Sequence, residues 1–168
     1  MNIFEKTAYK YPGIVEKMCL AAILAGARIM AVYSEDDFGI EMKSDDSPIT
    51  RADRLADDVI GKILEQNFPD VPIVSEESNC DLTAAMGDIY FLVDPLDGTK
   101  EFIKKTGEFT VNIAVILNGK AELGVVYVPV TKELYYRDLD GLSYLESGVS
   151  DFEVRGERNQ ISCRTADM

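Results

Sequence analysis

Two aspartates, Asp94 and Asp97, lie three residues apart at the end of an apolar run. The run Ile89–Val93 predicts a buried strand, and Pro95 is expected to end its ladder of hydrogen bonds. Both carboxylates should therefore emerge where this strand finishes. A pair of acids at such a place is able to bind a divalent cation, although a solvated turn containing proline and glycine is the simpler interpretation of these residues alone.

The residues that follow add an anion-binding backbone to the acids. Gly98 permits a positive φ or a close backbone approach, and Thr99–Ile103 predicts a short helix whose first N–H groups are free. A second apolar run, Ile73–Ser75, also ends in acids, Glu76 and Glu77. If the two strands pair, all these carboxylates meet, which indicates metal-assisted phosphate chemistry. A calcium loop of the EF-hand type is excluded, because proline and glycine occupy the second and fifth positions.

These segments resemble the inositol monophosphatase superfamily, and in particular its 3'(2'),5'-bisphosphate nucleotidase branch. The similarity extends over roughly Tyr11 to Arg164 and rests on four segments in the same order: Ser47–Asp53, Val74–Glu77, Asp94–Ile103 and Gly107–Ala114. The resemblance implies that Mg²⁺ is held by Glu76, Asp94, Asp97 and the carbonyl of Leu96.

The same resemblance implies roles for the remaining site residues. Thr99 and Asp53 would orient and deprotonate the attacking water, and the backbone of Gly98 and Thr99 would hold the substrate phosphate. Lys43 and Glu77 are further candidates beside the metals. The implied substrate is a small phosphate ester, adenosine 3',5'-bisphosphate, with AMP and phosphate as products. An inositol monophosphatase or a related sugar phosphatase is the alternative within the same chemistry.

One departure from the family concerns its second motif, a Trp-Asp pair whose aspartate completes the metal cluster. This chain contains no tryptophan and has 168 residues. We therefore expect residues 1–168 to form the family's N-terminal domain alone, truncated and impaired as a phosphatase. A catalytically inactive remnant or interaction module, completed by a separately encoded C-terminal half, is the alternative from another class.

Composition narrows the possible partners and chemistry. The formal charge is −13, which argues against nucleic-acid polymers and anionic membranes. The chain has no histidine, so imidazole chemistry and histidine zinc sites are excluded. Its three cysteines show no paired spacing, which favours a reducing cytoplasm. The N-terminus lacks the basic region, apolar core and cleavage site of a signal peptide, and no apolar run is long enough for a membrane span.

The periodicity predicts an α+β fold with two long helices on a largely antiparallel sheet. Helices are expected over Tyr11–Tyr33 and Arg51–Gln66, the second with Leu55 among its buried residues. Strands are expected over Phe38–Lys43, Ile73–Ser75, Ile89–Val93, Phe109–Leu117, Ala121–Val128, Glu133–Tyr136, Ser143–Glu146 and Asn159–Cys163, with a hairpin turn at Asn118-Gly119 and a helix or loop over Asp81–Met86.

Two features of the sequence pattern have more than one interpretation. Thr50 and Asp53 have the spacing of a helix capping box, which competes with the catalytic role that the resemblance implies for Asp53. The strands Phe109–Leu117 and Ala121–Val128 are apolar on both faces. Two helices cover only one face, so the other should be exposed and promote self-association.

Overall fold

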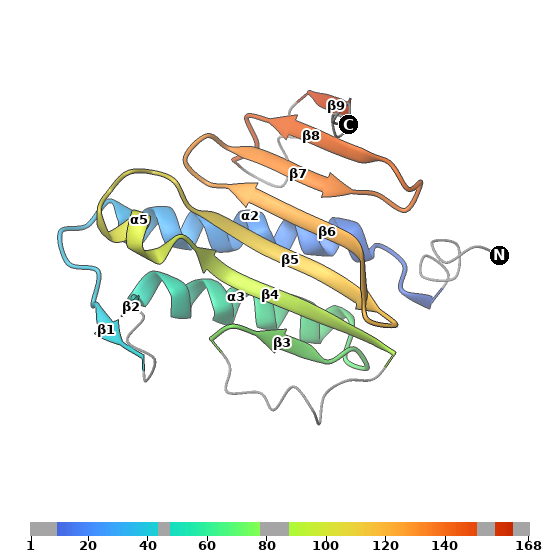
Figure 1. Cartoon of the computed structure of the whole chain (residues 1–168), viewed down its shortest axis with the longest axis horizontal. Helices are drawn as coiled ribbons and strands as arrows, with labels where there is room; N and C mark the ends of the chain where they lie inside the picture. The colour runs from blue at the N-terminus through green and yellow to red at the C-terminus, as the bar shows by residue number, and fades with distance from the viewer. Residues whose placement is uncertain (1–9, 44–47, 78–87, 151–156, 163–168) are drawn as a thin grey trace, which may run out of the picture.

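The computed structural model describes residues 10–43, 48–77, 88–150 and 157–162. Figure 1 shows two long helices packed against one face of an extended sheet. Within the described residues, the chain order is α2 (Ile14–Tyr33), β1 (Glu41–Met42), β2 (Pro48–Ile49), α3 (Arg51–Asn67), β3 (Ile73–Ser75), β4 (Ile89–Asp97), α5 (Thr99–Ile103), β5 (Thr110–Leu117), β6 (Lys120–Val128), β7 (Glu133–Arg137), β8 (Ser143–Ser147) and β9 (Arg158–Ile161). The expected α+β class is confirmed.

The main sheet has seven strands in the order β3-β4-β5-β6-β7-β8-β9. Strand β3 pairs parallel to β4, and all the other neighbours are antiparallel. The predicted Asn118-Gly119 hairpin turn is confirmed, because both residues have the positive φ values, 51° and 76°, that a tight hairpin requires. Sequential antiparallel strands need only short turns, which is why most of the sheet is a meander.

Helix α2 packs on the centre of the sheet, against β5, β6 and β7. It begins at Ile14 rather than Tyr11, directly after Gly13, which has a φ of 72°. Gly26 lets the helix approach β6 closely, because a Cβ added there would lie 2.5 Å from the ring of Tyr127. The small residues of this helix thus allow a tight contact with the strands.

Helix α3 packs beside α2 and against β3 and β4. Its expected N-cap, Thr50, is confirmed, and a four-residue spacing produces its buried stripe of Ala52, Ala56, Ile60 and Leu64. The expectation that Leu55 is buried is wrong, since 39% of this residue is exposed. It lies off the stripe, on the side of the helix that turns towards solvent.

Strand β4 differs from the prediction at its C-terminal end. It was expected to end at Asp94 because of Pro95, yet it continues to Asp97. The ladder with β5 shifts register between Asp94 and Asp97 and then resumes with Asp97 opposite Thr110. A local irregularity of this kind accommodates the missing N–H of proline without ending the strand.

Three other expectations have different outcomes. The strand expected over Phe38–Lys43 is reduced to β1, which pairs with β2 in a separate sheet. The segment Asp81–Met86 lies outside the described residues, as does Cys163 at the end of the last expected strand.

Among the described helices, none is both long and apolar enough to cross a membrane.

The face of the sheet opposite α2 and α3 carries exposed apolar side chains, as the sequence predicts. Leu92 is 44% exposed and Val126 is 38% exposed. A groove of about 580 Å³ runs over this face and is lined by Leu92, Ala114, Gly124 and Val126, among others. No described helix covers it, so apolar surface that is normally buried meets solvent.

We predict that this face drives self-association of the chain. Sedimentation over a range of concentrations should show association, and a hydrophobic dye should bind. Replacing both Leu92 and Val126 by threonine should reduce both signals, because it removes apolar area while keeping strand propensity. Leu142→Thr is the matched control, since Leu142 is 41% exposed but does not line the groove. A strictly monomeric, dye-silent wild-type chain would contradict the prediction.

Candidate functional site

The acids after β3 and at the end of β4 are brought together by the register of these two strands. Ser75 pairs with Val93, so Glu76 follows β3 beside Asp94 of β4. The N–H of Glu76 donates to the carbonyl oxygen of Val93 at 3.0 Å, which extends the pairing into the turn. The sequence prediction that the two acidic segments meet is therefore confirmed.

Asp94 is the electrostatic centre of this arrangement. Its Oδ1 is buried and is the only such side-chain oxygen or nitrogen among the described residues without a hydrogen-bond partner. Burial and the negative charges of Glu76 and Asp97 raise the pKa of Asp94 from 3.8 to about 7. An acid with a buried, unpaired oxygen beside other acids is a position that a hard cation would stabilise.

Asp97 is exposed at the end of β4 and is oriented by residues of β5. The side-chain amide of Asn112 donates to Asp97 Oδ2 at 3.2 Å, and the hydroxyl of Thr110 donates to Asn112 Oδ1 at 3.1 Å. No sequence motif predicts a role for Asn112 or Thr110. The sequence feature that could have identified them is a change along one face of the strand, which is polar at Thr110 and Asn112 and becomes apolar at Ala114.

Asp53 contacts two parts of the chain through its two carboxylate oxygens. Its Oδ2 accepts from the backbone N–H of Thr50 at 2.7 Å and from the Thr50 hydroxyl at 2.6 Å, as in a capping box. Its Oδ1 accepts from the hydroxyl of Thr99 at 3.1 Å. The two interpretations of Asp53 are therefore compatible, since the same buried carboxylate caps α3 and contacts a predicted site residue.

Gly98 and Thr99 form the turn between β4 and α5. Gly98 has a φ of 93°, and a Cβ added there would lie 2.7 Å from the carbonyl oxygen of Glu108, so both conformation and close approach require glycine. The Thr99 hydroxyl also lies 3.2 Å from the carbonyl oxygen of Leu96. The predicted metal-binding carbonyl and the predicted water-orienting hydroxyl thus share one turn.

Lys43 bridges the two glutamates after β3. Its Nζ lies 2.8 Å from Glu77 Oε1 and 3.1 Å from Glu76 Oε1. Burial alone would lower the pKa of Lys43, but the bonds and charges of the two glutamates outweigh it and raise the pKa. Burial also raises the pKa of Glu77, although Lys43 opposes this shift. Lys43 thus places a positive charge on the acidic cluster.

The residues fit a divalent cation in their chemistry. As their side chains lie, the described residues contain no group of three or more His, Cys, Asp or Glu arranged to hold a metal ion. Glu76 instead contacts Lys43. The unpaired oxygen of Asp94 nevertheless has the environment of a ligand atom, because a bound cation would offset the cost of burying its charged form.

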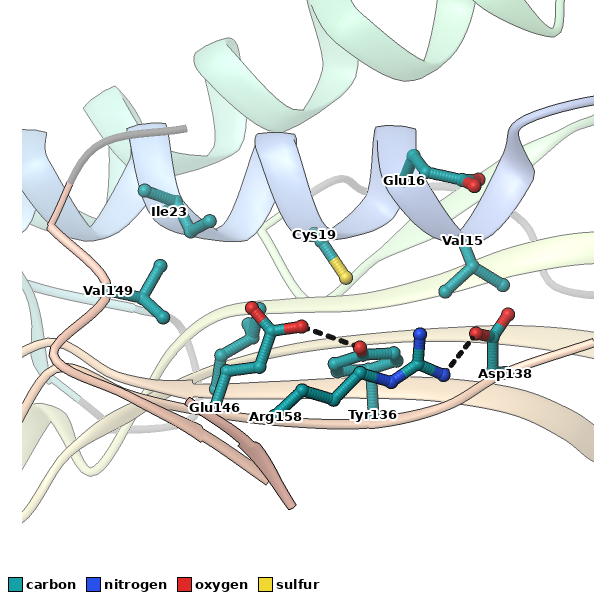
Figure 2. A pocket seen from close by; sticks show the side chains of 10 residues that line it. Val15, Glu16, Cys19, Ile23, Tyr136, Asp138, Glu146, Val149 and Arg158 are labelled. Atoms are coloured by element: carbon teal, nitrogen blue, oxygen red, sulfur yellow. Dashed lines mark hydrogen bonds and ion pairs between the residues drawn. The ribbon is translucent and has the colours of Figure 1, made fainter. Parts of the chain in front are cut away.

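A second cavity, of about 70 Å³, lies between α2 and the other edge of the sheet (Figure 2). The Tyr136 hydroxyl donates to the buried Glu146 at 2.7 Å, and Arg158 pairs with Asp138 at 2.7 Å. These polar groups satisfy one another. The cavity therefore lacks the unpaired oxygen that distinguishes Asp94.

Comparison with known proteins places this chain and its fold in a family. Residues 14–163 match the sequence profile of the Inositol monophosphatase family, and the chain belongs to that family. The chain is 45% identical, over 155 residues, to the 3'(2'),5'-bisphosphate nucleotidase CysQ of Salmonella typhimurium. It is 48% identical to the protein of the same name from Escherichia coli K12, also over 155 residues. The resemblance inferred from the sequence is confirmed.

A solved relative agrees with the fold. The crystal structure of CysQ from Bacteroides thetaiotaomicron, a bacterial member of the inositol monophosphatase family, superposes with a TM-score of 0.78 at 37% identity. That match covers 95% of this chain and 61% of the solved chain. The two curated relatives are likewise matched over 91% of this chain and 60% of their own length. The chain thus spans about three fifths of these relatives.

We predict that Asp94→Asn stabilises the metal-free protein at alkaline pH. Because folding raises the pKa of Asp94, stability falls as pH rises from about 4 through 7, and the asparagine removes this loss. Since Asp94 is only partly buried, solvent screens the effect to on the order of 1 kcal/mol, or about 2–4 °C in melting temperature.

Thermal unfolding in the presence of a chelator would measure this difference at pH 8 and pH 5. The gain should be largest at pH 8 and clearly smaller at pH 5, where only part of the loss between about pH 4 and 7 has accrued. Asp58→Asn is the control, because Asp58 is exposed and pairs with Lys62 on the same helix. An Asp94→Asn protein that is less stable than wild type at pH 8 would contradict the prediction.

Proposed function

We propose that this chain is the metal-binding part of a Mg²⁺-dependent phosphatase that acts on a small phosphate ester. The single observation that carries the proposal is the buried, unpaired Oδ1 of Asp94 among the acids after β3 and at the end of β4. Membership of the Inositol monophosphatase family supports it. The names of the similar proteins favour a nucleoside 3',5'-bisphosphate as the substrate, and the family resemblance implies the adenosine compound.

In this proposal Mg²⁺ would be held by Glu76, Asp94, Asp97 and the carbonyl of Leu96. When bound, the metal supplies a water of lowered pKa and stabilises the charge that develops on the leaving oxygen. The chain's own contribution is to hold several carboxylates close together despite their mutual repulsion. The pairing of β3 with β4 and the bond from Asn112 to Asp97 provide this support.

Thr99 and Asp53 would then move the proton of the attacking water. The Thr99 hydroxyl donates to Asp53 Oδ1, which leaves a lone pair of the Thr99 oxygen free to accept from water. As the water attacks phosphorus, its proton passes to Thr99 and the Thr99 proton passes to Asp53. Thr50 fixes the orientation of Asp53 by donating twice to Oδ2, so Oδ1 remains directed at Thr99.

The substrate phosphate would lie on the backbone of Gly98 and Thr99. The absence of a side chain at Gly98 lets the turn approach Glu108 closely. The first N–H groups of a helix that follows such a turn are able to bind an anion. Lys43 offers a positive charge beside the acids that is able to balance the phosphate when Glu76 turns to the metal.

A second candidate function is a non-catalytic interaction module. The observation that favours it is the apolar groove over the outer face of the sheet, with Leu92 and Val126 exposed. A surface of this kind binds protein more readily than it binds a charged phosphate ester. Metal binding and turnover distinguish the two candidates, because an interaction module needs neither.

We predict that the chain binds Mg²⁺ through Asp94. Isothermal calorimetry at millimolar Mg²⁺ should detect weak binding to wild type and none to Asp94→Asn, because the central carboxylate is lost. Thr99→Ala and Asp58→Asn should bind nearly as wild type does, since neither removes a proposed ligand. Equal heats from wild type and Asp94→Asn would overturn the assignment.

We also predict little turnover by this chain alone. It spans about three fifths of its relatives, and the family resemblance implies that a further metal ligand lies in the remainder. Phosphate release from adenosine 3',5'-bisphosphate should therefore stay below about 1 s⁻¹, an ordinary enzyme rate. Thr99→Ala should lower any residual rate by about a hundredfold.

Inositol 1-phosphate serves as the comparison substrate in the same assay. Faster release from inositol 1-phosphate would favour the sugar phosphatase alternative. A rate of 1 s⁻¹ or more would show that the chain contains all the groups that catalysis needs. A residual rate that is unaffected by Thr99→Ala would contradict the role proposed for the Thr99 hydroxyl.

A further inference from the structure

Helix α3 carries a second carboxylate, Asp57, one turn after Asp53. The Oδ1 of Asp57 accepts from the hydroxyl of Ser75 at 2.5 Å. Residues four apart lie on the same side of a helix, about 6 Å apart along its axis. Asp57 thus faces the end of β3, while Asp53 faces Thr99 after β4.

Ser75 connects Asp57 to the turn that carries Glu76. Ser75 is the last residue of β3 and is only 5% exposed. Its hydroxyl proton is donated to Asp57, so its lone pairs are available, and the backbone N–H of Glu77 lies 3.3 Å from the same oxygen. The hydroxyl thereby fixes the backbone on both sides of Glu76.

A role in packing alone does not explain an aspartate at this position. A buried serine hydroxyl is satisfied by any backbone carbonyl and needs no carboxylate. Asp53 and Asp57 are like charges at a spacing of four residues, which is mildly unfavourable on a helix, and Asp57 is bonded to the residue that precedes Glu76 and Glu77 in the chain. A carboxylate at position 57 is therefore electrostatically unfavourable on this helix, but it provides a strong hydrogen-bond acceptor for Ser75.

We propose that Asp57 is a positioning residue for Glu76 and acts through Ser75. The proposal rests on the proposed function, in which Glu76 is a ligand of Mg²⁺. Helix α3 then holds both acidic segments from one rigid element, the first through Asp57 and the second through Asp53. Without the Asp57 bond, the turn after β3 loses its fixed direction and Glu76 meets the metal less often.

Mg²⁺ affinity tests this inference on the whole chain. Loss of a residue that supports a ligand typically weakens metal binding by 10- to 100-fold, so Asp57→Ala should raise the dissociation constant by about tenfold. Asp57→Asn keeps an acceptor for Ser75 and should restore most of the affinity. Asp58→Ala removes the same charge from the adjacent position and should have little effect.

A double-mutant cycle with Ser75→Ala separates coupling from general damage. If Asp57 acts through Ser75, the protein with both Asp57→Ala and Ser75→Ala binds Mg²⁺ no more weakly than either single variant. Additive losses would overturn the proposed route. An affinity of Asp57→Ala equal to that of Asp58→Ala would show that Asp57 contributes only its charge.

Amide hydrogen exchange without metal supplies a readout that does not depend on metal binding. Asp57→Ala should increase the exchange rate of the Glu77 amide at least tenfold, whereas Asp58→Ala should leave it unchanged. Unchanged exchange in Asp57→Ala would overturn the coupling itself. Faster exchange together with a wild-type chain that binds no Mg²⁺ would instead overturn the proposed function and, with it, the ligand role of Glu76.

Discussion

Repulsion between the carboxylates of Glu76, Asp94 and Asp97 is the constraint on which the local structure depends. Burial and neighbouring charge raise the pKa of Asp94 to about 7, which means that the fold holds this acid where its charged form is unfavourable. The surrounding elements supply the compensation. Strand pairing fixes Glu76 beside Asp94, Asn112 holds Asp97, and Lys43 offsets the charge of Glu76.

Helix α3 links this electrostatic arrangement to the stability of the fold. Its apolar stripe packs on α2 and the sheet, so its N-terminus is held firmly in place. Asp53 uses one oxygen to cap the helix and the other to contact Thr99. Substitution of Asp53 would therefore have two effects. It would fray the first turn of α3, and it would release the hydroxyl of Thr99.

Most elements of this fold could be predicted from the sequence, because they depend on short-range patterns. The period of α3, its Thr50 cap and the Asn118-Gly119 turn each have a local physical cause. The continuation of β4 past Pro95 could not be predicted, since a register shift depends on the partner strand β5. Leu55 was misplaced because the hydrophobic period left the exact edge of the buried stripe open.

The site shows the same division between local and tertiary information. Its acids and the Gly98 turn are visible as motifs, and the family resemblance assigned them roles. The bond between Asp57 and Ser75 joins residues eighteen apart, and the bond between Asn112 and Asp97 joins residues fifteen apart. Neither pair has a sequence signature, because each contact arises only when a helix or strand is docked on its neighbour.

The exposed sheet face and the acidic site belong to one surface. Leu92 and Asp94 alternate with buried residues along β4 and therefore point to the same side, and the groove on that side extends from Glu76 and Asp94 to Val126. Any polypeptide that covers the apolar part of this groove also reduces the access of water to the acids. A lower local dielectric strengthens their interaction with a cation and with a phosphate. The same physical event, burial of this face, would thus complete both the core and the electrostatic environment of the site.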